Sequence, residues 1–296
     1  MILSSSQFKV DEANYIVIEP TQFTNITTRE ELFGLLEKHG VIKLRSCIDD
    51  ELDFSDYVRK NSARLSLDPA RVMVGGAAQL VDAGTQAVGL HCENGNSPFW
   101  PDLTWFYCKE APEVGSQTTL CDGQKVLKML SSECHSFFDT NLIRYSRRVA
   151  GEKWRLLVCY YSEHLNDPST VNFYDLLDVI GGNPQVKILH DACDDSIHYT
   201  FTTSAIQSSR FSSRLAFANN ILGPSYNYEI PVIDTVSGLA IPERFIDELK
   251  FCSEQCTFLA DWRDNDLIVI DNRRVMHGRQ PIIDERRCIF NALSYC

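Results

Sequence analysis

Hydrophobic and polar residues alternate in short blocks along the chain, and the first clear block predicts a helix. Residues 29–40 (REELFGLLEKHG) place four apolar side chains at helical spacing, with Thr28 as the N-cap and Gly40 as the stop. The next segment, 41–45 (VIKLR), alternates as a strand does. A helix that leads into a strand is therefore expected near the N-terminus.

Further strands are predicted from apolar or aromatic runs of strand length. These runs are 103–108 (LTWFYC), 154–161 (WRLLVCYY), 214–218 (RLAFA), 267–270 (LIVI) and 287–293 (RCIFNAL). Other helices are expected around 125–138 and 243–256. The pattern indicates a mainly β fold with flanking helices.

One long segment, 162–213, lacks strong periodicity and is rich in Asp, Ser, Thr and Asn. It is interpreted as an elaborated loop inserted in the fold, and long ordered loops are often lids. The chain shows no internal repeat and no low-complexity linker, so residues 1–296 are expected to form a single domain that carries this insertion.

The charge balance restricts the class of partner. The formal net charge is -12, and the basic residues are scattered. Surfaces that bind nucleic acid or anionic membranes need clustered Lys and Arg, and a membrane span needs about 20 consecutive apolar residues, which no stretch approaches. A small-molecule substrate is expected, with no nucleic-acid or membrane partner, and the sequence leaves the oligomeric state open.

Cysteine usage indicates the compartment. The eleven cysteines run from Cys47 to Cys296 in an odd number, which does not suit a compact disulfide framework. The first nine residues are polar and lack the apolar run of a secretory signal. Free thiols in a reducing cytoplasm are the expectation.

The first chemical signal is the triplet His91-Cys92-Glu93. Residues two apart in a strand point to the same face, so His91 and Glu93 would present an imidazole and a carboxylate to one ion while Cys92 faces away. His277, in the segment DNRRVMHGR, is the best third ligand. Two His and one carboxylate form the facial arrangement of non-haem Fe(II) oxygenases.

Spacing alone leaves other interpretations open. The chain has seven histidines, so a chance pairing with an acidic residue is common, and His91 would then be a surface residue bonded to Glu93. The same three ligands also suit a zinc-dependent hydrolase. A non-catalytic β-barrel binding protein with a vestigial site is the third alternative.

Three separated motifs resemble the taurine dioxygenase and clavaminate synthase superfamily. The segment GLHCENGNSPFWPDLTWFYC (89–108) resembles its iron-binding strand and the strand that follows. The segment GSQTTLCDG (115–123) is similar to its Gly-Gly-Asp-Thr strand, with Thr118 at the Thr position. The segment DNRRVMHGRQPIIDERRCIF (271–290) resembles its C-terminal iron and co-substrate block.

The resemblance implies a double-stranded β-helix (a jelly-roll, cupin-like core) with Fe(II) held in its mouth. The ligands carried over are His91, Glu93 and His277, and the co-substrates are 2-oxoglutarate and O2. Asp is commoner than Glu at the carboxylate position. Glu is typical of the branch that resembles clavaminate synthase and the amino-acid hydroxylases.

The co-substrate also needs a cation, because the keto end of 2-oxoglutarate binds metal and its distal carboxylate lies in the barrel. The guanidinium fork of Arg meets a carboxylate with two parallel hydrogen bonds. Arg287, ten residues after His277, matches the family's co-substrate Arg, and Thr118 would add a hydroxyl. The adjacent Arg286 would face the opposite way on a strand.

The substrate side departs from taurine dioxygenase, which grips its sulfonate with a second Arg four residues after the first. Asn291 stands at that place, so a sulfonate is not expected. Asn94 and Arg279 are further candidates, although Asn94 also suits a turn and Arg279 could face solvent. The HxE motif, the Asn at position 291 and the acidic, cytoplasmic character of the chain together indicate a small amino-acid-like metabolite of specialised biosynthesis, which is hydroxylated, desaturated or cyclised.

Overall fold

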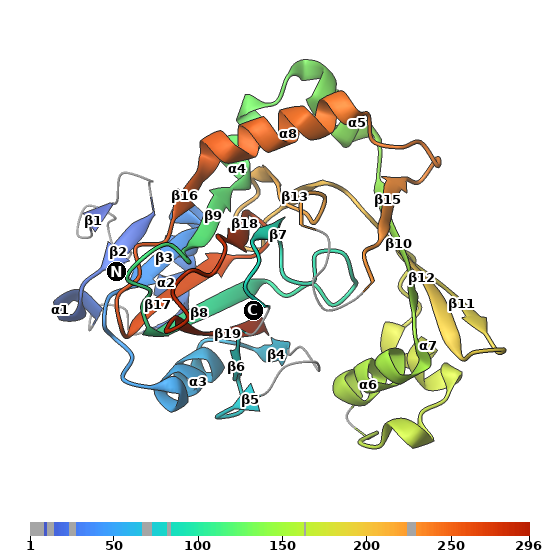
Figure 1. Ribbon diagram of the computed structural model, residues 1–296, viewed down its shortest axis with the longest axis horizontal. Coiled ribbons are helices and arrows are strands. Elements are labelled where there is room, and N and C mark those ends of the chain that lie inside the picture. Colours follow the sequence, from blue (N-terminus) through green and yellow to red (C-terminus); the bar gives the residue numbers. More distant parts are fainter. Residues whose placement is uncertain are drawn as a thin grey trace.

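A computed structural model describes residues 9–10, 15–23, 28–66, 73–81, 84–162, 164–223 and 229–296. The described chain is mainly β with flanking helices, and it is organised around two sheets (Figure 1). The larger sheet has the order β1-β2-β3-β17-β8-β19-β6-β5, with β4 paired to β19. The smaller sheet has the order β16-β9-β18-β7. The fold class predicted from the pattern is confirmed at this level.

The strands of the larger sheet are β1 (Lys9–Val10), β2 (Ile16–Ile18), β3 (Val41–Leu44), β4 (Arg64–Ser66), β5 (Met73–Val74), β6 (Ala78–Leu80), β8 (Leu103–Glu110), β17 (Asp266–Asp271) and β19 (Cys288–Tyr295). Those of the smaller sheet are β7 (Val88–His91), β9 (Thr118–Asp122), β16 (Thr257–Leu259) and β18 (Val275–Arg279).

The two sheets pack face to face because alternate residues of their strands are apolar on the inner side. Phe106 and Cys108 of β8 lie in one buried cluster with Leu120 of β9 and Val275 of β18. The other face of β8, which carries Trp105 and Tyr107, packs instead against helices α2 (Arg29–His39) and α3 (Glu51–Lys60). The larger sheet is thus covered on both faces.

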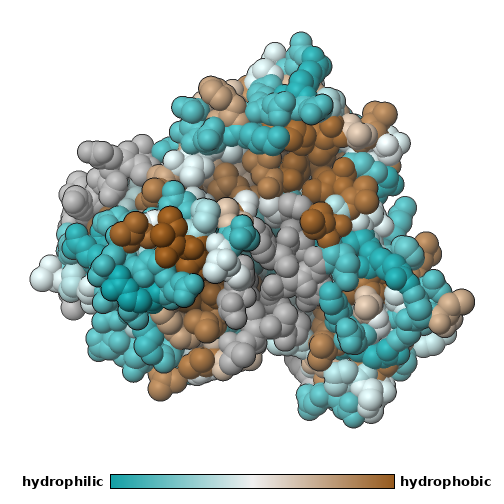
Figure 2. Space-filling view, viewed as in Figure 1, coloured by the Kyte–Doolittle hydropathy of each residue, from teal (hydrophilic) through white to brown (hydrophobic). Residues whose placement is uncertain are grey.

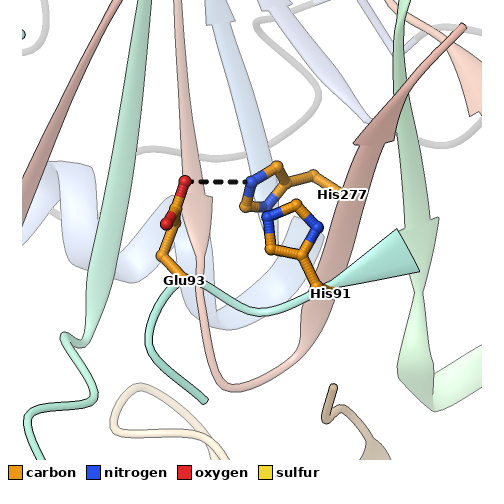
Figure 3. A group of neighbouring side chains, drawn as sticks. All are labelled: His91, Glu93 and His277. Carbon is orange, nitrogen blue, oxygen red and sulfur yellow. Dashed lines mark ion pairs between the residues drawn. The ribbon is translucent and has the colours of Figure 1, made fainter. Parts of the chain in front are cut away.

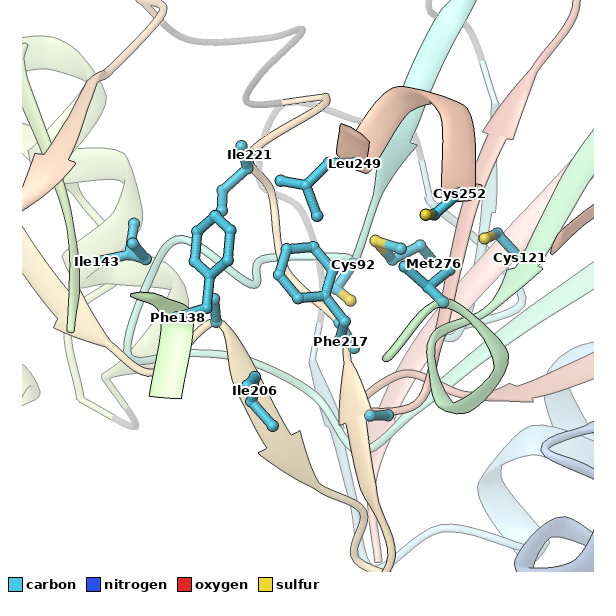
Figure 4. Packing of buried hydrophobic residues seen from close by; sticks show 14 of the residues in the cluster. Cys92, Cys121, Phe138, Ile143, Ile206, Phe217, Ile221, Leu249, Cys252 and Met276 are labelled. Carbon is cyan, nitrogen blue, oxygen red and sulfur yellow. The ribbon is translucent and has the colours of Figure 1, made fainter. Parts of the chain in front are cut away.

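The outer face of the smaller sheet is covered by α4 (Gly123–Met129), α5 (Ser132–Thr140) and α8 (Glu243–Cys256) (Figure 4). Cys92 and Met276 point into this apolar cluster, beside Phe217 and Leu249. Both residues are buried neighbours of the predicted ligands. The prediction that Cys92 faces away from the metal is confirmed.

A second lobe extends from this core. Its sheet has the order β11-β12-β10-β15, made of β10 (Ile143–Val149), β11 (Val186–Asp191), β12 (Ser196–Thr203) and β15 (Val232–Thr235). Helices α6 (Gly151–Tyr161) and α7 (Phe173–Ile180) pack with it around Trp154 and Leu176 (Figure 1). The hairpin β13 (Ile206–Ser208) and β14 (Leu215–Phe217) joins the lobe to the core.

Apolar side chains form more than one patch on the face shown. Figure 2 shows them below the region where Figure 1 places α8 and again on the left, whereas the lobe at the lower right is mostly polar. No helix in the described ranges combines the length and the hydropathy that a bilayer crossing requires.

Several predicted elements are confirmed. Thr28 caps α2 through a capping box with Glu31, and Gly40 ends the helix in the left-handed region with φ 71°. The strand predicted at 41–45 is β3, and the runs at 103–108, 214–218, 267–270 and 287–293 lie in or overlap β8, β14, β17 and β19. The helix expected at 243–256 is α8.

The strand predicted at 154–161 is wrong, since this run lies in helix α6. Trp154 and Val158 are four residues apart and both buried in the core of the lobe. An apolar run of eight residues is compatible with the helical period of about 3.6 residues and with the strand period of 2. Here the packing of the run against the lobe makes it a helix. The single helix expected at 125–138 is two helices, because Leu130 has extended backbone with ψ 140°.

The prediction that 162–213 is an irregular loop is also wrong. The described part of this segment contains a short 3-10 helix (Pro168–Thr170), α7, β11, β12 and β13. Ile197 and Phe201 of β12 are buried although Ser and Thr residues alternate with them. Thr is a good strand former, so a polar composition did not mean an irregular chain.

Candidate metal centre

Three side chains converge at the mouth of the two sheets: His91, Glu93 and His277 (Figure 3). One ligand atom from each residue lies within 4.8 Å of the others. Nε2 of His277 is 3.4 Å from Oε1 of Glu93, and the two imidazole ring centres are 4.3 Å apart. The sequence motif therefore corresponds to a three-dimensional cluster with two nitrogen donors and one carboxylate.

The strands position the two histidines. His91 is the last residue of β7, and His277 of β18 is its direct antiparallel partner. Gly278 allows this close approach, because a Cβ at that position would lie 2.5 Å from the carbonyl oxygen of Val88. The register shifts at this point between His277 and Arg279, as in a bulge beside an active site.

Glu93 is held differently from the prediction, which placed it on the same strand as His91. The strand ends at His91, and Glu93 begins a turn. Asn272 fixes its backbone: the Glu93 N–H donates to Asn272 Oδ1 at 2.9 Å, and Asn272 Nδ2 donates to the Glu93 carbonyl at 3.0 Å. The carboxylate is thus positioned by the turn after β17 and not by strand periodicity.

The hydrogen bonds also favour metal binding through Nε2 of both imidazoles. Nδ1 of His91 lies 2.8 Å from the carbonyl oxygen of Gly89, which can only accept, so Nδ1 carries the proton and Nε2 is left as a donor to metal. His277 already presents Nε2 to Glu93, while its Nδ1 has no hydrogen-bond partner within the described chain. The edge of Phe106 packs against the His277 ring at 5.0 Å.

A pocket extends from the three residues into the space between the sheets. It is also lined by Val81, Val88, Phe106, Thr118, Gly278, Arg279, Arg287 and Asn291. All five residues proposed from the sequence as metal or co-substrate ligands therefore line one pocket.

Arg287 lines this pocket and lies immediately before β19. Its Nη2 donates to Thr118 Oγ1 at 3.2 Å, and Trp262 Nε1 donates to the same oxygen at 3.1 Å. Burial, followed by the positive charge of Arg279, lowers the pKa of Arg287 to about 10. Its Nε lacks a partner among the described residues. A half-buried cation with a spare donor fits the distal carboxylate of 2-oxoglutarate.

Arg286 has the opposite orientation, as expected for its neighbour in sequence. It is exposed and pairs with Asp284 and Glu113, each at 2.9 Å. These two carboxylates raise its pKa. Of the two adjacent arginines, only Arg287 lines the pocket of His91, Glu93 and His277.

The substrate-side candidates separate into two places. Asn291 of β19 is buried, with Nδ2 3.5 Å from Oε1 of Glu93. Arg279 of β18 is buried too and donates to the carbonyl oxygens of Gly84 and Gln86, both at 2.7 Å, so it does not face solvent. Asn94 instead has the left-handed backbone of a turn (φ 53°) and lines a different cavity.

That second cavity lies between the lobe and the segment 94–99 that follows Glu93. The sequence predictions missed it. The signal was present in residues 154–161, whose aromatic and branched side chains line the cavity at helical spacing. The role of Asn272 was also missed, because it depends on a contact between residues 179 positions apart.

Comparison with known proteins agrees with this geometry. Residues 9–293 match the model of the family described as "Taurine catabolism dioxygenase TauD, TfdA family". The chain belongs to this family. The family expected from the three motifs is thereby confirmed, and the cluster of His91, Glu93 and His277 is compatible with the Fe(II), 2-oxoglutarate and O2 that the resemblance implies.

Two curated relatives are similar in sequence. The chain is 21% identical over 221 residues to the dapdiamide synthesis protein DdaC of Enterobacter agglomerans. The aligned region covers 68% of the chain and 64% of the relative. The chain is 24% identical over 210 residues to a 3-((Z)-2-isocyanoethenyl)-1H-indole synthase of Fischerella ambigua, covering 64% and 59%. The chain thus matches less than two thirds of the length of either relative.

Solved structures share the fold. The crystal structure of the PvcB protein of Pseudomonas aeruginosa has a TM-score of 0.62 at 15% identity, over 98% of this chain and 90% of that one. A second structure of PvcB, described as an Fe, alpha-ketoglutarate dependent oxygenase from an isonitrile synthetic pathway, has a TM-score of 0.59 at 15% identity over the same shares. A putative 2,4-D dioxygenase of Burkholderia xenovorans has a TM-score of 0.58 at 13% identity, over 95% and 93%.

Proposed function

We propose that this dioxygenase oxidises a small amino-acid-like metabolite of specialised biosynthesis, by hydroxylation, desaturation or cyclisation. 2-Oxoglutarate would be converted to succinate and CO2 in the same turnover. The observation that supports the chemistry is that His91, Glu93 and His277 converge in one pocket with the half-buried Arg287.

Each residue of the pocket has a distinct role in this proposal. His91, Glu93 and His277 would hold Fe(II), and the iron, when bound, would supply the redox chemistry that couples O2 to substrate oxidation. Arg287 binds the distal carboxylate of 2-oxoglutarate, and the hydroxyl of Thr118 adds a hydrogen bond. Trp262 and Arg287 both bond to that hydroxyl and fix its position.

Asn291 and Arg279 complete the pocket wall. Asn291 places a neutral amide beside Glu93, where a sulfonate would need a cation. Arg279 is held by two carbonyl oxygens and adds positive charge near Arg287. A neutral or amide-bearing substrate group near Asn291 is consistent with this wall.

The relatives support a role in specialised biosynthesis. Their printed names refer to dapdiamide synthesis and to an isocyanoethenyl indole, and one structural neighbour is described as part of an isonitrile synthetic pathway. None of these descriptions refers to a sulfonate. An amino-acid-derived substrate agrees with them and with the HxE motif.

The proposal extends to the architecture and the setting. The two packed sheets would form the double-stranded β-helix, with the segment 162–213 serving as the substrate lid of a single catalytic domain. All eleven cysteines are free thiols, which suits a reducing cytoplasm. A small molecule is the proposed partner, with no nucleic acid and no membrane.

A zinc hydrolase with the same three ligands is less well supported. Such a site needs no buried cation for a dicarboxylate, so Arg287 and its bond to Thr118 would have no function. A non-catalytic barrel would have no reason to keep the complete ligand set.

Succinate release tests the function. The iron-loaded protein is incubated with 2-oxoglutarate, O2 and a panel of amino acids, N-acylated amino acids, sulfonates and aryloxyacetates. Succinate that depends on an amino acid or its derivative is expected. Release that depends only on a sulfonate or an aryloxyacetate would contradict the substrate class.

A further inference from the structure

The cavity between the lobe and the segment 94–99 is a pocket of about 110 Å³ that opens to the surface. Its walls are mainly apolar. Trp154 and Leu157 of α6, Leu176 of α7 and Ile197 of β12 form the lobe side. Phe99 forms the core side and stacks on Tyr161 with ring centres 3.9 Å apart, so an aromatic contact joins the two sides.

One wall of the cavity carries two polar side chains, in addition to Asn94, Asn96, Ser97 and Lys153 elsewhere in the lining. Arg147 of β10 and Tyr199 of β12 are direct cross-strand partners, and both line the space. The hydroxyl of Tyr199 is buried and has no hydrogen-bond partner in the portion of the chain that is described. Burial raises its pKa, so it keeps its proton and remains a donor. A cation and an unpartnered donor on one wall suit a carboxylate.

The cavity adjoins the metal centre through the backbone. Glu93 lines the metal pocket, and the next residue, Asn94, lines this cavity. The segment 93–99 is fixed at both ends. The Glu93 backbone is hydrogen-bonded to Asn272, and the Phe99 carbonyl accepts from the Tyr295 hydroxyl at 3.0 Å. Consecutive residues of one fixed loop therefore line the metal pocket and this cavity.

We infer that this cavity is the substrate subsite and takes an organic acid with a bulky aromatic or branched apolar body. The carboxylate meets Arg147 and the Tyr199 hydroxyl, and the body lies between Phe99, Trp154 and Leu157. Arg147 and Tyr199 set the specificity for an acid. The inference rests on the proposed function, since it identifies the substrate class of the same active site.

Binding without turnover tests it. Metal-free protein is titrated by calorimetry with N-acetyl-L-tryptophan, N-acetyl-L-leucine and indole-3-propionate, each compared with its amide, and with N-acetyl-L-alanine. At least one of the three bulky acids binds at least about tenfold more tightly than its amide, because a charge-assisted hydrogen bond is lost in the amide. N-acetyl-L-alanine binds at least about tenfold more weakly than that acid. Equal affinity for acid and amide, or no binding by any bulky acid, overturns the inference.

Variants locate the site. Arg147→Gln and Tyr199→Phe lower the affinity for the acid toward that of the amide. Arg148→Gln is the matched control: this neighbour lies on the other side of β10 and pairs with Asp194, so the affinity stays unchanged. Leu157→Trp fills the cavity and weakens both ligands. An Arg148→Gln effect equal to that of Arg147→Gln overturns the assignment.

The outcomes separate this inference from the proposed function. Arg287→Ala, which removes the co-substrate cation, leaves binding of the bulky acid intact, and added 2-oxoglutarate does not displace it. If the bulky acid binds as predicted for the wild type and the variants but no acid causes succinate release, the proposed function is contradicted and the assignment of the subsite is retained. Turnover of an amino-acid derivative with an unchanged KM in Arg147→Gln contradicts the subsite and leaves the function standing.

Discussion

Nε2 of His277 lies 3.4 Å from Oε1 of Glu93, although the two residues belong to different motifs of the sequence. Two ligands that bond one ion at about 2.0–2.2 Å and at right angles to each other are about 3 Å apart. The observed separation is close to this value. The site is thus arranged for an ion that both residues share with His91.

Replacement of any ligand should abolish iron binding. His91→Ala, Glu93→Ala and His277→Ala are each expected to lower Fe(II) affinity by more than about 100-fold, since loss of even an outer-sphere partner costs 10–100-fold. Calorimetric titration under nitrogen measures this, and circular dichroism checks that the fold is retained. Full activity of Glu93→Ala would show that the ligand assignment is wrong.

Asn272 should matter although it does not face the metal. Asn272→Ala removes both hydrogen bonds to the Glu93 backbone and one to the Pro101 carbonyl at 2.9 Å. A 10–100-fold loss of Fe(II) affinity and a fall of about 1–3 kcal/mol in the free energy of unfolding are expected. Asn141→Ala, which breaks a remote helix-end bond to Phe137, is the control. It should lower stability without changing iron affinity, and equal affinities for the two variants would refute the positioning role.

The two adjacent arginines should differ sharply. Arg287→Ala is expected to weaken 2-oxoglutarate binding by about 2–5 kcal/mol, because a buried carboxylate loses its charged partner. Arg286→Ala should change it little, since Arg286 is exposed and paired with Asp284 and Glu113. The KM for 2-oxoglutarate measures both. The reverse order of effects would mean that the wrong arginine has been assigned.

A buried carboxyl should give stability a distinctive pH dependence. Burial raises the pKa of Asp271 to about 6, so the folded state holds a proton that the unfolded chain releases between about pH 4 and 6. Above pH 6 the charged form is penalised in the folded state by up to about 3 kcal/mol, and below pH 4 the penalty vanishes.

Asp271→Asn keeps an oxygen that can accept from the Arg273 N–H and cannot ionise. The free energy of unfolding of the variant should exceed that of the wild type above pH 6, and the difference should fall to zero near pH 4. Urea denaturation at several pH values measures it. A difference that grows toward acid pH would contradict the assignment to Asp271.

The sequence predicted those parts of the fold that local signals determine. The cap at Thr28, the stop at Gly40 and the strands of the core have short-range patterns that the structure follows. The strand prediction for 154–161 failed because the spacing of Trp154 and Val158 is compatible with a strand and with a helix. Only their packing in the lobe makes the segment helical. The prediction for the segment 162–213 failed partly because β12 is rich in Thr and Ser, and such a composition suggests a loop.

The residues proposed for the site could be predicted from the sequence, but the contacts that position them could not. His91, Glu93 and His277 were predicted from donor type and the family resemblance, and Arg287 from that resemblance together with the charge that a dicarboxylate requires. The position of Glu93 beyond the end of β7 was not predictable, because it depends on Asn272 from a distant turn. The cavity on the lobe depends likewise on the packing of α6 against residues 94–99.

The most direct test of the iron and 2-oxoglutarate site is the visible absorption spectrum without oxygen. Fe(II) and 2-oxoglutarate added together to the wild-type protein under nitrogen should produce a broad visible band, because the keto acid chelates an ion held by three protein ligands. Neither component alone should produce it, and Glu93→Ala should lack it. Zn(II), with its filled d shell, should give no colour. A wild-type protein that stays colourless with both components, or a Glu93→Ala protein that shows the full band, would contradict the site.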